Sequence, residues 1–135
     1  MKNQSLSGKK VLLLASSGVD EEVMSVTQRD LTKAGAIVKT VGAEPGLINS
    51  WNGSTFGLYF PVDIQINTAL GSDFDVLVVP SGSRSIQKLI NNPHAERIVS
   101  SFVAAQKPMC FIGDARVLLE KTGHEGVAVT ASVEE

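Results

Sequence analysis

The sequence predicts an α/β fold, a three-layer sandwich built around a mostly parallel sheet. Continuous apolar runs are typical of parallel strands that are buried on both faces. Stretches with helical spacing of apolar residues alternate with these runs, which favours repeated strand–helix–strand units. The expected strands are residues 10–16, 36–41, 75–80 and 107–112.

The segments between these strands carry helix start and stop signals. Asp20 is the predicted N-cap of a first helix, which runs through Lys33 and stops at Gly35. Pro93 fits the first position of a later helix that extends through Ala105. The remaining expected elements are a short helix at 86–90, a helix at 115–121, and a last strand, or its beginning, at 127–132.

Residues 43–70 differ from the rest because they are rich in Gly, Asn, Ser and aromatic residues. Asn52-Gly53 is a strong turn signal, and the alternation over 58–66 predicts short antiparallel strands or a hairpin. Two roles remain open for the aromatic side chains here: closing one end of the core, or anchoring an interface. These side chains are Trp51, Phe56, Tyr59 and Phe60.

Length and composition predict one domain over residues 1–135, with 43% hydrophobic and 19% charged residues. A net charge of -2 argues against a nucleic-acid partner, and no apolar run is long enough for a membrane span. The polar first ten residues and the lone cysteine lead us to expect a cytoplasmic protein. Residues 132–135 read as the start of a helix without a body, so we expect a truncated module or one completed by a partner.

Several local sequences, in this order over about residues 9–120, resemble the DJ-1/ThiJ/PfpI family of the class I glutamine amidotransferase-like fold. They are Lys9-Lys10-Val11-Leu12-Leu13-Leu14, Gly18-Val19-Asp20, Lys33-Ala34-Gly35-Ala36-Ile37-Val38, Phe74-Asp75-Val76-Leu77-Val78-Val79-Pro80-Ser81-Gly82 and Lys107-Pro108. The Gly18-Val19-Asp20 turn and Ile112-Gly113-Asp114 look most like the C-terminal domain of large-subunit catalases. The resemblance implies a flavodoxin-like sandwich.

The departures from the family pattern concern its catalytic groups. Residues 107–120 read as a strand, a sharp turn and a helix, the junction that holds a nucleophile in active relatives. The turn residue here is Gly113, which has no side chain to react. Active relatives also carry a Glu on the first helix, beside the nucleophile. That position is Val23 here, and Glu22 lies one residue early. The Pro-Gly-Gly whose amides form an oxyanion site in active relatives is Pro80-Ser81-Gly82 in this chain. We therefore predict a vestigial pocket formed by Gly113, Asp114, Ser81, Gly82, Glu22 and Ser17.

Individual residues in this region have simpler interpretations too. We interpret Asp114 as the N-cap of the helix that follows it, the alternative being a pocket carboxylate near Arg116. Cys110 is expected to be a buried structural thiol, with redox sensing as the alternative. Glu21 and Glu22 favour the first helix dipole, and Arg84 with the exposed amides of 81–83 could hold a small anion.

These observations favour a non-catalytic domain that serves assembly or small-ligand binding, as a homodimer or with a fused or partner domain. The alternatives are a stress protein, deglycase or hydrolase with an unusual site, and a redox sensor acting through Cys110. His94 and His124 are the only histidines, and neither has neighbours at ligand spacing. We predict no catalytic residue, no cofactor and no metal.

Overall fold

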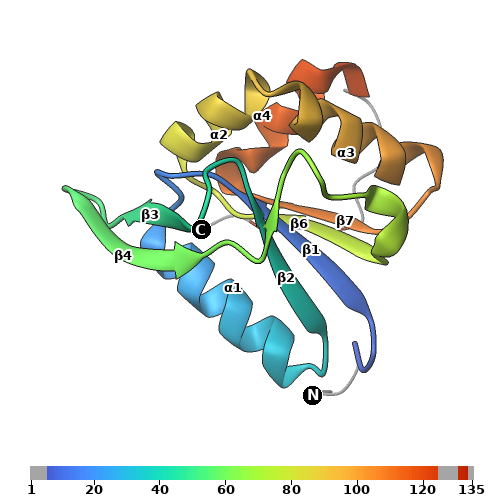
Figure 1. Cartoon of the computed structure of the whole chain (residues 1–135), viewed down its shortest axis with the longest axis horizontal. Coiled ribbons are helices and arrows are strands. Elements are labelled where there is room, and N and C mark those ends of the chain that lie inside the picture. Colours follow the sequence, from blue (N-terminus) through green and yellow to red (C-terminus); the bar gives the residue numbers. More distant parts are fainter. Residues whose placement is uncertain (1–5, 125–130, 134–135) are drawn as a thin grey trace.

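The computed structural model describes residues 6–124 and 131–133, which form the predicted α/β sandwich around a six-stranded parallel sheet (Figure 1). The strand order is β5-β2-β1-β6-β7-β8, and every neighbouring pair is parallel. All four strands expected from the apolar runs are present. The strands are β1 (Lys10–Ala15), β2 (Ile37–Gly42), β5 (Ile64–Gln65), β6 (Val76–Val79), β7 (Met109–Ile112) and β8 (Ala131–Val133).

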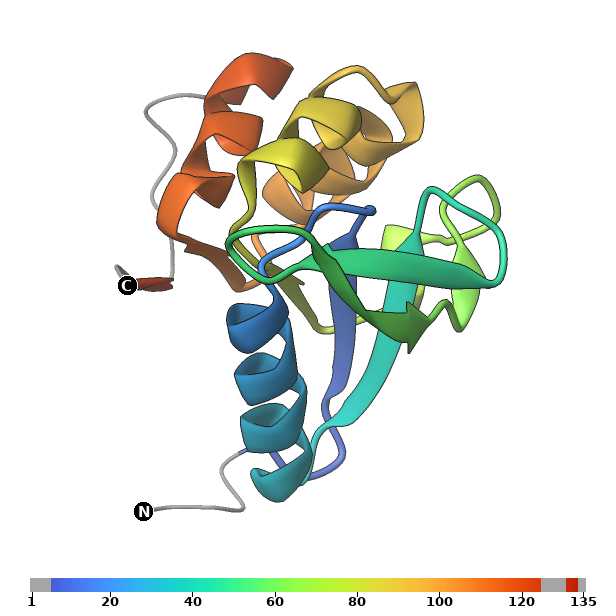
Figure 2. The same cartoon turned by 90° about the vertical axis from the view of Figure 1, so that its left-hand side faces the viewer.

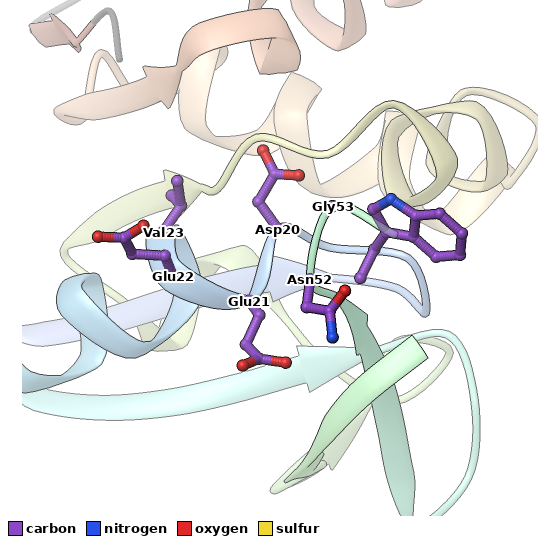
Figure 3. Close-up of a pocket in the computed structure, with 7 residues that line it drawn as sticks. Asp20, Glu21, Glu22, Val23, Asn52 and Gly53 are labelled. Atoms are coloured by element: carbon purple, nitrogen blue, oxygen red, sulfur yellow. The ribbon is translucent and has the colours of Figure 1, made fainter. Parts of the chain in front are cut away.

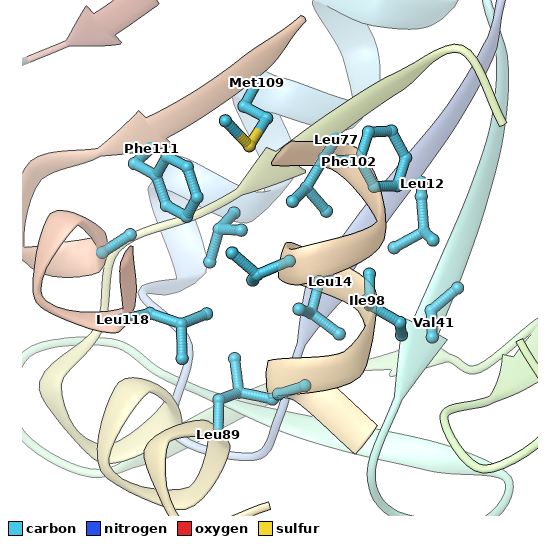
Figure 4. Close-up of a cluster of buried hydrophobic side chains, with 14 of the residues drawn as sticks. Leu12, Leu14, Val41, Leu77, Leu89, Ile98, Phe102, Met109, Phe111 and Leu118 are labelled. Atoms are coloured by element: carbon cyan, nitrogen blue, oxygen red, sulfur yellow. The ribbon is translucent and has the colours of Figure 1, made fainter. Parts of the chain in front are cut away.

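Helices cover both faces of the sheet (Figures 1 and 2), and the two core clusters contain residues of α1 on one face and of three other helices on the other face. α1 (Glu21–Lys33) packs on the first face, where Val11, Leu13 and Met24 are fully buried. The second face carries α2 (Ser83–Ile90), α3 (Pro93–Ala104) and α4 (Arg116–Leu119). Leu12 and Leu14 point to that face and join the larger core cluster (Figure 4). This alternation along β1 is what a strand buried on both faces requires.

The predicted hairpin is present. β3 (Leu47–Trp51) and β4 (Phe56–Pro61) pair antiparallel, and the Asn52 side chain accepts hydrogen bonds from the Ser54 and Thr55 amides in the turn. Ile48 and Phe60 face the core and are buried. Four large apolar side chains of the hairpin are instead about half exposed or more: Leu47, Phe56, Leu58 and Tyr59.

The C-terminal part departs from the sequence prediction. The helix expected at 115–121 is broken into a 3₁₀ turn (Gly113–Ala115), α4 and a π turn (Glu120–His124). The Thr122 hydroxyl donates to the Leu118 and Leu119 carbonyls at the distorted end. The strand expected at 127–132 begins at Ala131, and residues 127–130 lie outside the described part. In the described part, no helix has both the length and the apolar character to cross a membrane.

Candidate functional site at the carboxyl edge of the sheet

The site predicted from the sequence lies where the order of the strands reverses. From β1 the chain proceeds outward to β2 on one side, whereas β6 and β7 follow on the other side. In open α/β sheets, ligands bind beside the carboxyl ends of the strands at this reversal. The loops after β1, β6 and β7 meet here and bring together Asp20, Ser81, Gly82, Gly113 and Asp114.

Gly113 begins the turn after β7 and has a φ of 56°, in the left-handed region that glycine adopts at little cost. A Cβ atom at this position would lie 3.2 Å from the Ser81 Cβ and 3.8 Å from the Ser81 hydroxyl oxygen. Ser81 is only 6% exposed. The elbow expected from the sequence is therefore present, and Ser81 occupies the space in front of its missing side chain.

Asp114 does not cap the helix that follows it, so that prediction is wrong. Its Oδ1 atom accepts a hydrogen bond of 2.9 Å from the N–H of Gly82, and Gly82 is the N-cap residue of α2. Neither the 3₁₀ turn nor α4 has a side-chain cap. The elbow carries Asp114 to the start of a neighbouring helix, where free N–H groups and the helix dipole favour a carboxylate. Among the described residues, no ion pair joins Asp114 to Arg116.

Asp20 occupies the N-cap position of α1, as predicted, but its side chain makes no cap hydrogen bond. The carboxylate instead accepts a hydrogen bond of 2.7 Å from the Ser81 hydroxyl, and the Asp20 N–H donates to the Ser81 carbonyl. Gly82, with a φ of 137°, lies against the same loop: a Cβ here would come within 2.7 Å of the Asp20 nitrogen. Only glycine fits where the two loops cross.

Ser17 is held by the hairpin side of the edge rather than by the elbow. Its hydroxyl accepts the Asn49 N–H, and its own N–H donates to Glu44. The Ser16 hydroxyl also donates to the Glu44 carboxylate, which lies 3.7 Å from the Lys88 ammonium group. Glu44 was not predicted from the sequence as part of the site. The signal available was its position two residues after the end of β2, at the same edge of the sheet.

Glu22 is exposed and, together with Asp20, Val23 and Trp51, lines an open cavity of about 360 Å³ beside the start of α1 (Figure 3). Val23, at the position of the family acid, packs partly buried against the core cluster under α1. Glu21 and Glu22 point away from each other in Figure 3. Glu21 does more than favour the helix dipole, because its Oε1 accepts the Leu58 N–H and the Ser50 hydroxyl.

Arg84 lies over the Trp51 ring, with its guanidinium carbon 3.6 Å from the ring centroid, a cation–π arrangement. Arg84 and the 81–83 amides were expected to hold a small anion. In the structure, the Arg84 guanidinium is stacked on Trp51 of the hairpin, and the Gly82 amide is bonded to Asp114. The sequence predicted neither partner.

Cys110 was predicted to be buried, but it is only half-buried. It points to the face that α1 alone covers, while its neighbours Met109 and Phe111 point to the face with three helices. Burial nevertheless raises the pKa of the Cys110 thiol, which disfavours the reactive thiolate.

The described residues include no cluster of three or more His, Cys, Asp and Glu side chains suited to a metal ion. His94 lies on α3, and its Nδ1 atom is 3.4 Å from the Arg97 guanidinium group. The His124 side chain lies outside the described part.

The parallel sheet, its layers of helices and the strand–turn–helix elbow define an α/β domain of the flavodoxin-like type. The sequence matches the DJ-1/PfpI family over residues 9–134, so the chain belongs to this family. No match is found among curated protein sequences.

Solved structures share this fold. Drosophila melanogaster DJ-1beta has a TM-score of 0.78 at 21% identity, over 87% of this chain and 62% of that one. A DJ-1 superfamily protein from Salmonella typhimurium, solved as a mutant, has a TM-score of 0.74 at 25% identity, over 94% and 74% of the two chains. A two-domain Anabaena variabilis protein with DJ-1/ThiJ/PfpI-like and ferritin-like domains has a TM-score of 0.77 at 23% identity, over 86% and 32%. The chain thus spans about a third of the Anabaena protein and about three fifths of the Drosophila one.

Proposed function

We propose that this chain is a non-catalytic DJ-1/PfpI domain whose role is assembly. One observation carries the proposal. The elbow residue is Gly113, and the Gly82 N–H, which belongs to the loop that forms the oxyanion site in active relatives, is already bonded to Asp114. Covalent catalysis needs an attacking atom, an activating base and donors for the developing oxyanion. Gly113 supplies no attacking atom, and Val23 supplies no acid or base. The Gly82 N–H is engaged by a carboxylate at 2.9 Å.

The surface that we assign to assembly is the β3–β4 hairpin. Residues 45–62 contain no charged side chain, although 19% of the whole chain is charged. The half-exposed Leu47, Phe56, Leu58 and Tyr59 all lie on this hairpin, and exposed apolar side chains concentrated in one element are typical of protein interfaces. Glu21 and an isolated bridge between Asp20 and Trp51 tie the hairpin to the start of α1. A second copy of this chain is the partner we propose.

The Anabaena protein pairs its DJ-1/ThiJ/PfpI-like domain with a ferritin-like domain. That arrangement supports the view that this chain serves as a module beside a fused or partner domain. The lone cysteine is consistent with the reducing cytoplasm that we propose as its location.

Small-ligand binding is the second candidate role. The open cavity of about 360 Å³ lined by Glu22 and Trp51 favours it, because it lies beside the switch point where α/β ligands bind. A ligand-dependent rise in melting temperature that is lost on changing Glu22→Ala would support this role over assembly alone.

Turnover measurements test the absence of catalysis. Purified wild-type protein and Cys110→Ser are assayed side by side against glyoxal adducts and against amide and peptide esters. We expect both proteins to match the uncatalysed rate. Robust wild-type turnover that Cys110→Ser abolishes would overturn the proposal and assign the reaction to the strand thiol three residues before the elbow.

A further inference from the structure

The turn of the β3–β4 hairpin contains an asparagine–glycine pair that neither assembly nor the core explains. Asn52 and Gly53 are both exposed, and the turn projects from the body of the domain (Figure 1). In such a pair the glycine nitrogen can attack the side-chain carbonyl of the asparagine, because glycine has no β-carbon to obstruct the approach. A Cβ on Gly53 would meet nothing within 4 Å, so the space beside it is open.

The hydrogen bonds of the turn favour this attack. The Asn52 Oδ1 atom accepts the Ser54 N–H at 3.0 Å and the Thr55 N–H at 3.1 Å. These two donors polarise the carbonyl and would stabilise the negative charge that develops on its oxygen, as the donors of an oxyanion hole do. Within the part of the chain that the structure describes, no group accepts the Gly53 N–H. This nitrogen can therefore lose its proton without the loss of an intrachain hydrogen bond.

The other exposed asparagines of the described part, Asn67 and Asn91, lack this arrangement. Neither is followed by glycine. The N–H that follows Asn67 donates to the Gln65 carbonyl at 3.0 Å, and the N–H that follows Asn91 donates to the Leu89 carbonyl at 3.1 Å. At both positions the nitrogen that would attack is already hydrogen-bonded.

We propose that Asn52 is a site of spontaneous deamidation and that this reaction switches off assembly through the hairpin. The Gly53 nitrogen forms a bond to the Asn52 Cγ, its proton leaves with Nδ2 as ammonia, and a cyclic succinimide results. Water then opens the imide at one of its two carbonyls, which gives aspartate or isoaspartate at this position. The inference rests on the proposed function, since it supplies a covalent means of regulating the hairpin that we assign to assembly.

Either product places a negative charge where it is unfavourable. Residues 45–62 carry no charge, and the described residues that line the cavity beside Asn52 include three carboxylates but no Lys, Arg or His (Figure 3). A Cβ on Gly57 would lie 3.1 Å from the Glu21 Cδ and 3.5 Å from the Asn52 Cβ, so these two side chains are neighbours. Glu21 holds β4 by accepting the Leu58 N–H. Repulsion between like charges therefore loosens the hairpin, and the new charge opposes burial of its apolar side chains.

Mass spectrometry tests the reaction. Wild-type protein is incubated at pH 8, at a concentration at which sedimentation shows monomer, and a second sample is incubated unfolded in urea. We expect a gain of about 1 Da at Asn52 in the native chain, at a rate at least equal to that of the unfolded chain. The native rates at Asn67 and Asn91 should be lower by about tenfold or more. A native rate at Asn52 below the unfolded rate, or equal native rates at the three asparagines, would overturn the inference.

Sedimentation tests the consequence for assembly. Asn52→Asp carries the charge of the product from the start, and we expect it to weaken the dimer by about tenfold or more. Asn67→Asp is the matched control, because it places the same charge at an exposed asparagine outside the hairpin and should leave the dimer intact. A dimer that Asn52→Asp leaves unchanged, or that both variants weaken equally, would overturn the switch.

A variant that cannot react completes the design. Asn52→Ser keeps a side-chain acceptor for the turn but has no amide to lose. Wild type and Asn52→Ser are aged together as dilute monomers and then concentrated. The wild type should lose its dimer in step with the gain in mass, whereas Asn52→Ser should keep its dimer. Parallel loss in both proteins would count against deamidation as the cause.

Failure of this inference and failure of the proposed function give different results. Deamidation is read from mass alone, on monomer. A chain that is monomeric at every concentration would overturn the assembly proposal and the switch with it, while the mass still decides whether Asn52 reacts. A dimer that forms and withstands deamidation at Asn52 would count against this inference alone.

Discussion

Replacing Gly113 with cysteine should destabilise the domain rather than restore an active site. At a φ of 56°, a residue with a side chain costs about 1–2 kcal/mol relative to glycine. Its Cβ would also meet the Ser81 Cβ at 3.2 Å, and such overpacking costs about 1–3 kcal/mol. We therefore expect Gly113→Cys to lower the free energy of unfolding by about 2–5 kcal/mol, measured by urea denaturation with an unchanged m-value.

Two substitutions at Ser81 separate these costs. Ser81→Gly removes the Cβ that faces residue 113, whereas Ser81→Ala removes the hydroxyl but keeps that Cβ. Both lose the hydrogen bond to Asp20, so the two double mutants with Gly113→Cys differ mainly in the steric contact. In double-mutant cycles, Ser81→Gly should offset about 1 kcal/mol of the cysteine penalty and Ser81→Ala almost none. Equal coupling for both, or a Gly113→Cys protein as stable as the wild type, would refute this reasoning.

Three further outcomes are expected. Because burial raises the pKa of the Cys110 thiol, labelling of this thiol at pH 8 should be slower than labelling of free cysteine. The free energy of unfolding should also fall as the pH rises above about 8.5, because the thiol ionises in the unfolded chain before it does so in the folded one. Labelling as fast as free cysteine would contradict this expectation. Sedimentation at micromolar concentration should show a dimer that Tyr59→Lys dissociates and Leu70→Lys, an exposed apolar control outside the hairpin, leaves intact; a wild-type monomer at all concentrations would remove the assembly proposal. Glu21→Ala should cost about 1.5–3 kcal/mol in urea denaturation, against less than about 0.5 for the exposed Glu22→Ala, and similar costs for both would contradict the role of Glu21 in holding the hairpin.

The strands and the hairpin were predictable because their signals are local. A run such as Val11-Leu12-Leu13-Leu14 has to be buried on both faces, and Asn52-Gly53 favours a tight turn whatever surrounds it. The position of the elbow was equally predictable, since a strand, a glycine and a helix follow one another in the sequence.

The hydrogen-bond partners at the site were not predictable from local signals. Asp20 and Asp114 both precede helices, where an aspartate ordinarily caps its own helix. In the fold, the Ser81 hydroxyl and the Gly82 N–H, both from the loop after β6, donate to these carboxylates instead. The exposure of Cys110 depends likewise on how many helices cover each face of the sheet, which no short window of sequence reports.

The crossing of the loops after β1 and β6 has a consequence for how this domain could acquire a ligand. A Cβ on Gly18 would collide with the Arg84 side chain, as one on Gly82 would collide with the backbone around Asp20. The two main chains and the Arg84 Cβ, the side-chain atom nearest to the main chain, therefore fill the crevice between these loops. Point substitutions cannot open it, because they leave both backbones in place. Lengthening one of the two loops is the change that would separate them, so a gain of binding between β1 and β6 should require an insertion.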